Sequence, residues 1–168
     1  MIIIICGLPG VGKSTLAKHL APVFDATILS SDKIRKELFP NPTYLPSELK
    51  TVYDVMTIIA KYLNDAGINC ILDATFNRED SRMEIREKLK LADNQLHIIE
   101  CSCPEEVAIS RLGSRRNDYS DATISVYQRM KKIHEPVKAD HITVDTTFSP
   151  EDNTDKIIEY ISKRTEST

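Results

Sequence analysis

The 168-residue sequence predicts a three-layer α/β/α fold, in which helices cover both faces of a five-stranded parallel sheet. Short apolar runs recur along the chain and alternate with segments whose apolar residues are spaced three and four apart. This alternation is typical of β-α-β units, whose right-handed crossovers produce a parallel sheet. The length suits one domain over residues 1–168, which can bury a core without disulfides or metal ions.

The predicted strands are five apolar runs, most of them rich in Ile, Leu or Val. They are Ile2–Cys6, Thr27–Leu29, Asn69–Leu72, Leu96–Glu100 and Ile142–Val144. Helical spacing marks the amphipathic segments 49–63, 85–92 and 122–133. Ser-Pro-acid patterns after Ser102 and Ser149 predict helix N-termini, and the proline-rich stretch Pro40–Pro46 predicts a loop between two helices.

The composition is that of a soluble globular protein, with 41% hydrophobic and 28% charged residues and a net charge of −3. This balance limits any nucleic-acid contact to a local patch. The apolar start is too short for a signal peptide, and no run approaches the roughly 18 residues that cross a membrane. We therefore expect a cytoplasmic protein without membrane contact. Cys6, Cys70, Cys101 and Cys103 lie in or beside predicted strands, which favours buried, reduced thiols.

A glycine-rich loop follows the first predicted strand and precedes a helix. Such a loop exposes unpaired backbone N–H groups at the helix N-terminus, where they bind phosphate. Lys13 supplies a point charge to the β- and γ-phosphates, and the Ser14 hydroxyl can coordinate Mg²⁺. The sequence thus predicts a site for ATP and Mg²⁺. The residues expected to bind the nucleotide are Gly7, Leu8, Pro9, Gly10, Val11, Gly12, Lys13, Ser14 and Thr15.

A second polar cluster follows the second predicted strand, at the sheet edge where ligands of open α/β folds bind. Asp32 could accept a proton from an acceptor hydroxyl, and Arg35, one helical turn on, could hold an anionic group of the acceptor. Helix capping by Ser31 or Asp32 is the alternative.

A third cluster follows the third predicted strand. Asp73 could hold Mg²⁺ or position the acceptor, with Thr75 beside it, or it could simply be a turn residue at the strand end. Arg82, near the start of the next helix, could reach the acceptor or remain a solvated surface residue.

Three arginines lie near the end of a later helix. Phosphoryl transfer needs positive charge over the moving phosphate, and a lid that closes over the nucleotide supplies it. Arg111, Arg115 and Arg116 are therefore predicted to act from a lid at about residues 111–120. A solvated basic helix end is the alternative. The basic face at residues 129–134 is interpreted as solvated surface.

Together these clusters resemble the P-loop kinases related to polynucleotide 5′-kinases, zeta-toxin kinases and AAA_33-type ATP-binding proteins. The resemblance implies that Asp32 is the general base, that Arg35 contacts an acceptor phosphate, and that a lid arginine meets the ATP phosphates. It covers nearly the whole chain. The motifs that carry it are Gly7–Ser14, Ser31-Asp32 with Arg35, Asp73-Ala74-Thr75 with Arg82, and Arg111–Arg116.

The leading hypothesis is an ATP-dependent kinase that phosphorylates a hydroxyl group, most readily a 5′-hydroxyl of RNA or DNA. A small metabolite is the close rival as acceptor. An ATPase or nucleotide-dependent switch is the alternative of another class, although a switch needs no acceptor base.

Overall fold

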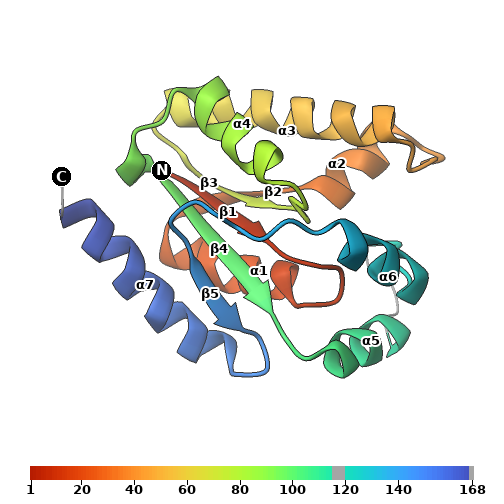
Figure 1. Cartoon of the computed structure of the whole chain (residues 1–168). Coiled ribbons are helices and arrows are strands. Elements are labelled where there is room, and N and C mark those ends of the chain that lie inside the picture. Colours follow the sequence, from red (N-terminus) through yellow and green to blue (C-terminus); the bar gives the residue numbers. More distant parts are fainter. Residues whose placement is uncertain (115–119, 167–168) are drawn as a thin grey trace.

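The computed structural model describes residues 1–114 and 120–166, which form a parallel sheet in the order β2-β3-β1-β4-β5 (Figure 1). All five predicted strands are confirmed, and four of them extend one or two residues beyond their predicted bounds. The strands are β1 (Ile2–Cys6), β2 (Ala26–Ser30), β3 (Asn69–Asp73), β4 (Leu96–Ser102) and β5 (Ile142–Asp145).

Helices cover both faces of the sheet, as predicted. In Figure 1, α3 and α4 lie above the sheet, and α1 and α7 lie below it. The helices are α1 (Lys13–Val23), α2 (Ser31–Leu38), α3 (Pro46–Asp65), α4 (Glu79–Leu89), α5 (Glu105–Ser114), α6 (Ile124–Ile133) and α7 (Pro150–Glu166), with a 3₁₀ turn η1 at Asp93–Gln95. None of the helices in the described ranges is long and apolar enough to cross a lipid bilayer.

The position of β1 at the centre of the sheet explains why its sequence is apolar without interruption. Ile2, Ile4 and Cys6 face the core beneath α3 and α4, whereas Ile3 and Ile5 face α1 and α7. All five side chains are fully buried. Because successive side chains of a strand point to opposite faces, a strand with helices on both sides needs apolar residues at every position.

The helix boundaries partly follow the predictions. Ser149 caps α7, since its Oγ accepts from the backbone N–H of Asp152 at 3.1 Å. Ser102 does not cap α5, because its hydroxyl donates to the Val144 carbonyl of the neighbouring strand at 3.3 Å. The stretch Pro40–Pro46 does connect α2 to α3.

Two other expectations were only partly correct. The periodic segment that ran to Ala92 ends earlier, because Lys90 takes the left-handed conformation (φ 52°) and closes α4 after Leu89. Three of the four cysteines are buried, and burial raises the pKa of the Cys6 thiol to about 12, so that it stays protonated. Cys103 is partly exposed.

His97 on β4 is fully buried, and its ring packs edge-on against Tyr160 with the ring centroids 6.3 Å apart. Burial, together with repulsion from Arg164, lowers the pKa of His97 to about 4. The folded protein therefore keeps this imidazole neutral at pH values where an unfolded histidine, with a pKa near 6.5, takes up a proton.

Protonation of the unfolded chain should make His97 a source of acid sensitivity. Between pH 6.5 and pH 4 the unfolded state binds the extra proton, so stability falls as the pH falls. The loss attributable to His97 should be about 2 kcal/mol between pH 7 and pH 5. Urea denaturation across this range should show a shallower pH dependence for His97→Leu than for the wild type. Equal slopes would contradict this account of His97.

Candidate active site

The site begins with the register of three neighbouring strands. Asp73 at the end of β3 pairs with Ile5 of β1 on one side and with Ser30 of β2 on the other. The segments that leave these strands therefore start side by side at one edge of the sheet. As a result, the glycine loop, the Asp32 segment and the Asp73 segment converge, as the sequence predicted.

The glycine loop needs its glycines for two physical reasons. Gly7, Gly10 and Gly12 all have positive φ, at 135°, 81° and 92°. A Cβ on Gly7 would lie 2.5 Å from the Cys101 carbonyl oxygen, and one on Gly10 would lie 2.7 Å from the Ala108 carbonyl oxygen. Side chains are therefore excluded by both conformation and contact, and the loop is held against β4 and α5.

Charged and hydroxyl groups lie beside the loop, and they come from Lys13, Ser14 and Asp73. Lys13 Nζ donates to the Leu8 carbonyl at 2.9 Å, and burial lowers the Lys13 pKa while nearby Asp73 opposes that shift. The Ser14 hydroxyl donates to Asp73 Oδ2 at 2.6 Å. A hydroxyl beside a carboxylate fits Mg²⁺, which uses one or two protein carboxylates and completes its shell with phosphate and water oxygens.

One side of the loop opens into a cavity of about 710 Å³. Arg111 lies in its wall and is held there, with Nη1 donating to Thr146 Oγ1 at 2.9 Å and Nη2 to the Thr146 carbonyl at 2.7 Å. The Thr146 hydroxyl in turn donates to the Val11 carbonyl at 2.6 Å. Arg111 is thus fixed close to the loop, whereas Arg115 and Arg116 lie outside the described residues.

The other side of the loop opens into a second cavity of about 270 Å³. Gly10, Gly12 and Ser14 line both cavities, so the phosphate loop separates them. The second cavity brings together four residues that the sequence singled out, namely Asp32, Arg35, Asp73 and Thr75. In its wall are also Tyr44, Leu49, Tyr53, Asp121, Val126, Arg129 and Met130.

The alternative that Asp32 only caps α2 is not supported by the structure. The capping position of α2 is Ser30, and no side chain makes a capping hydrogen bond there. Asp32 lies in the first turn, partly buried in the cavity wall. Its role as a general base stays a prediction.

Arg35 is buried in an ion pair that the sequence did not reveal. Its Nη1 donates to Glu48 Oε1 at 2.9 Å, and the two side chains are only 8% and 5% exposed. Glu48 also accepts from the backbone N–H and the hydroxyl of Thr43 and from the backbone N–H of Tyr44. Burial alone would raise the Glu48 pKa, but these hydrogen bonds together lower it. The pair is charged, and among its buried polar atoms within the described residues only the Arg35 Nε is left without a hydrogen-bond partner.

Tyr44 lies in the cavity wall, on the loop before α3. Its hydroxyl donates to Asp121, which also accepts from Lys36 Nζ at 3.1 Å. The Arg35 guanidinium lies over its ring, 4.9 Å from the centroid. Burial and the bond to Asp121 raise the Tyr44 pKa, so the phenol remains a donor. Tyr44 also has positive φ (59°), which Glu48 helps to maintain through its hydrogen bonds.

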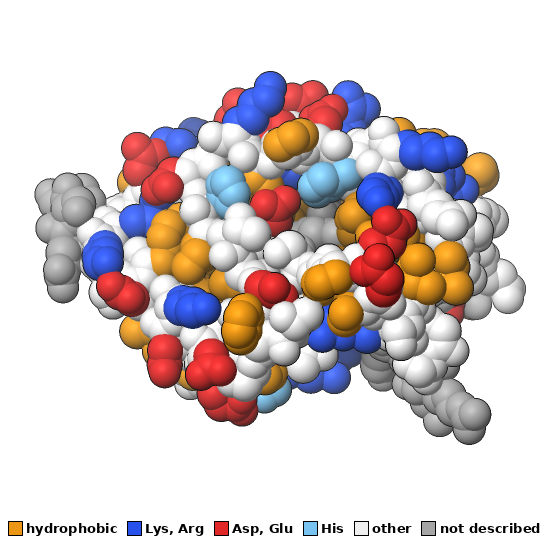
Figure 2. Space-filling model, turned by 60° about the horizontal axis from the view of Figure 1, so that its bottom comes forward, with side chains coloured by type: hydrophobic (Ala, Val, Ile, Leu, Met, Phe, Trp, Pro, Cys, Tyr) orange, Lys and Arg blue, Asp and Glu red, His pale blue; other side chains and the backbone are white. Residues whose placement is uncertain are grey.

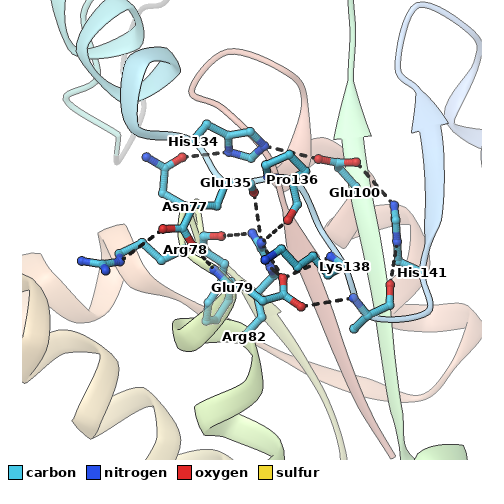
Figure 3. Close-up of polar contacts among 12 residues, drawn as sticks. Asn77, Arg78, Glu79, Arg82, Glu100, His134, Glu135, Pro136, Lys138 and His141 are labelled. Atoms are coloured by element: carbon cyan, nitrogen blue, oxygen red, sulfur yellow. Dashed lines mark hydrogen bonds and ion pairs between the residues drawn. The ribbon is translucent and has the colours of Figure 1, made fainter.

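Contrary to the prediction, Arg82 does not reach the acceptor, because its side chain is held elsewhere in the structure (Figure 3). The side chain is fully buried, and it pairs with Glu79 Oε2 at 2.6 Å. Its remaining N–H groups donate to the carbonyls of Phe76, Glu135 and Pro136. Arg82 therefore joins α4 to the chain that follows α6. The alternative interpretation, a solvated arginine on the surface, is also wrong, because Arg82 is fully buried.

Sequence reasoning missed Tyr44, Glu48, Tyr53 and Thr146. Tyr44 lay in a stretch interpreted only as a connector, and Glu48 looked like an ordinary acid in a first helical turn. The partners of Tyr44 and Thr146 are distant in sequence, since Tyr44 bonds Asp121 and Thr146 bonds Val11. The proline-rich composition around Tyr44, unusual for a simple connector, was the available signal.

Comparison with known proteins agrees with this geometry. The AAA_33 model, described as an AAA domain, matches residues 2–137. The chain belongs to the AAA_33 family. An adenylate kinase of Cyanothece is 30% identical over 147 residues, covering 79% of this chain and 75% of that protein. An uncharacterised protein of Mycobacterium tuberculosis is 30% identical over 134 residues, or 71% of this chain, but these make up only 26% of the longer protein.

Solved structures share the fold of this family member. A sugar kinase of Janibacter has a TM-score of 0.78 with 17% identity, covering 96% of this chain and 94% of that one. The Mycobacterium tuberculosis APS kinase, in complex with AMPPNP and APS, has a TM-score of 0.75 with 14% identity and 96% coverage of both chains. At these identities the likeness concerns the fold.

Lys13→Ala should weaken ATP binding at least tenfold, because the variant removes the point charge from the phosphate loop. Calorimetric titration with ATP measures the change. Lys61→Ala is the control, since Lys61 is an exposed partner of Asp65 on α3. An unchanged dissociation constant for Lys13→Ala would contradict the assignment of the loop.

Arg82→Ala should lower the free energy of unfolding by about 3–5 kcal/mol, because it leaves Glu79 and three carbonyls without their buried partner. The exposed Arg86, one turn further along α4, pairs with Asp93 at the surface. Arg86→Ala should therefore cost less than about 1 kcal/mol. Denaturant titration of both variants tests the difference, and similar losses would refute the structural role of Arg82.

Proposed function

We propose that the protein is an ATP-dependent kinase that phosphorylates a hydroxyl group of a small molecule. The observation that carries this proposal is the pair of cavities that share the phosphate loop. The larger cavity suits the nucleotide and the smaller one suits the acceptor. The membership of the family and the kinases among its relatives support the same activity.

Each side chain has a distinct proposed part in this reaction. Lys13 and the backbone N–H groups of the loop hold the phosphates, and Arg111 stabilises the negative charge on the transferring group. Asp32 accepts the proton of the attacking hydroxyl. Ser14 and Asp73 would hold Mg²⁺, which when bound neutralises phosphate charge. We propose residues 1–168 as one kinase domain, with residues 111–120 as its lid.

The smaller cavity favours a small acceptor over a polynucleotide. At about 270 Å³ it lies near the lower end of the range for small-molecule sites. Tyr44 and Asp121, both in its wall, are hydrogen-bonded to each other. On the face drawn in Figure 2, acidic and basic side chains are interspersed, without the broad basic field that a nucleic acid would attract.

A 5′-hydroxyl at a polynucleotide end is the second candidate acceptor. It is favoured by Arg129, which is exposed yet lines the cavity, and by its exposed neighbours Lys131 and Lys132. Lys131, however, already pairs with Glu105 at 2.6 Å, which reduces the charge available to a phosphate backbone.

Asp32→Asn should leave ATP binding within about twofold of the wild type and lower phosphoryl transfer at least a hundredfold, because the amide cannot accept the proton. Transfer is followed with radiolabelled ATP and a panel of sugars, nucleosides and 5′-hydroxyl oligonucleotides. Label on small molecules supports the proposal, and label on the oligonucleotides alone would select the second candidate. Unaltered transfer by Asp32→Asn would remove Asp32 from the chemistry.

A further inference from the structure

We infer that the acceptor is an alcohol that carries no phosphate or carboxylate group. The inference rests on the proposed kinase function and concerns the charge of the smaller cavity. Family resemblance assigned Arg35 to an acceptor phosphate. In this chain the protein itself supplies the anion that Arg35 faces.

The partner of Arg35 is fixed by more than the ion pair. Glu48 lies in the first turn of α3, and it accepts three hydrogen bonds of 2.7–3.3 Å, from the backbone N–H groups of Thr43 and Tyr44 and from the Thr43 hydroxyl. A carboxylate held this way cannot swing aside for an incoming anion without releasing the loop that carries Tyr44. The charge of Arg35 is consequently neutralised before any acceptor arrives.

The remaining charges of the cavity are mixed, with as many basic as acidic groups among the described residues. Asp32 and Asp121 contribute carboxylates, and Asp121 is balanced by Lys36, which pairs with it at 3.1 Å. Lys13 belongs to the phosphate loop, with Asp73 close by, and Arg129 is exposed. An anionic acceptor would therefore meet Asp32 at close range, while Arg35 is already paired with Glu48 and Lys13 is assigned to the phosphates of the nucleotide.

The rest of the wall suits a molecule with an apolar part. Leu49, Val126 and Met130 supply aliphatic surface, and the Tyr53 ring is stacked on Phe76 with the centroids 5.1 Å apart. Tyr53 OH accepts from the Phe76 backbone N–H at 3.2 Å and lies 3.4 Å from the Thr75 hydroxyl. Thr75 and Tyr53 could thus hydrogen-bond a neutral acceptor and orient its hydroxyl towards Asp32.

The test compares matched pairs of probes that differ by one anionic group: glucose with glucuronate, ribose with ribose 5-phosphate, and uridine with uridine monophosphate. Their binding is measured by calorimetry on the full chain saturated with a non-hydrolysable ATP analogue. This test measures binding and needs no phosphoryl transfer. The kinase proposal is tested separately with radiolabelled ATP, so its failure can be distinguished from failure of this inference. The wild type should bind the charged member of each pair no more tightly than the neutral member.

Glu48→Gln keeps an oxygen acceptor for Arg35 and Thr43 but removes the charge, so it should improve binding of the charged probes about tenfold. Asp121→Asn serves as a second variant in case the first disturbs the Tyr44 loop, and it should shift binding in the same direction. Asp54→Asn is the control, because Asp54 lies on the same helix and pairs with Lys50 and Lys88 at the surface.

Two results would overturn the inference. One is a wild-type preference for the charged member of any pair. The other is the absence of improved binding of charged probes in both Glu48→Gln and Asp121→Asn. Improvement in these variants but not in Asp54→Asn supports it, since only the first two change the charge inside the cavity.

Discussion

The candidate site depends on the parallel pairing of β3 with its two neighbours. Asp73 pairs with Ile5 on one side and with Ser30 on the other. The three chain segments that follow these residues therefore leave the sheet at the same edge. Backbone hydrogen bonds fix this arrangement, and the apolar side chains of β1 bury both faces of the sheet around it. Asp32 and Asp73 therefore gather at one edge of the sheet, beside a core built from the apolar side chains of β1.

Much of this could be predicted because the responsible signals are local. The continuous apolar run of Ile2–Cys6 indicated a strand buried on both faces, and the glycines at 7, 10 and 12 indicated a phosphate loop. Both are properties of short segments, and both were confirmed in the structure. General rules for parallel sheets then placed Asp32 and Asp73 at the same carboxyl edge, whereas the order of the strands came from the structure.

The sequence was least informative about the hydrogen-bond partners of long side chains. Arg35 and Arg82 looked alike in sequence, since each lies near the start of a helix after a sheet-edge segment. Arg35 turns towards the cavity and meets Glu48, whereas Arg82 is buried among backbone carbonyls. Glu79 is close to Arg82 in sequence, but the Glu135 and Pro136 carbonyls that complete its shell come from a distant segment, about which composition and periodicity carry no information.

The placement of two cavities on either side of one loop has a kinetic consequence. On the proposed assignment, donor and acceptor are bound at the same time in two cavities that share Gly10, Gly12 and Ser14. The phosphoryl group would then pass directly between the two molecules in an in-line displacement, and no side chain would carry it. The proposed kinase would accordingly follow a sequential rate law that requires both substrates at once, and it would invert the configuration at phosphorus in each turnover.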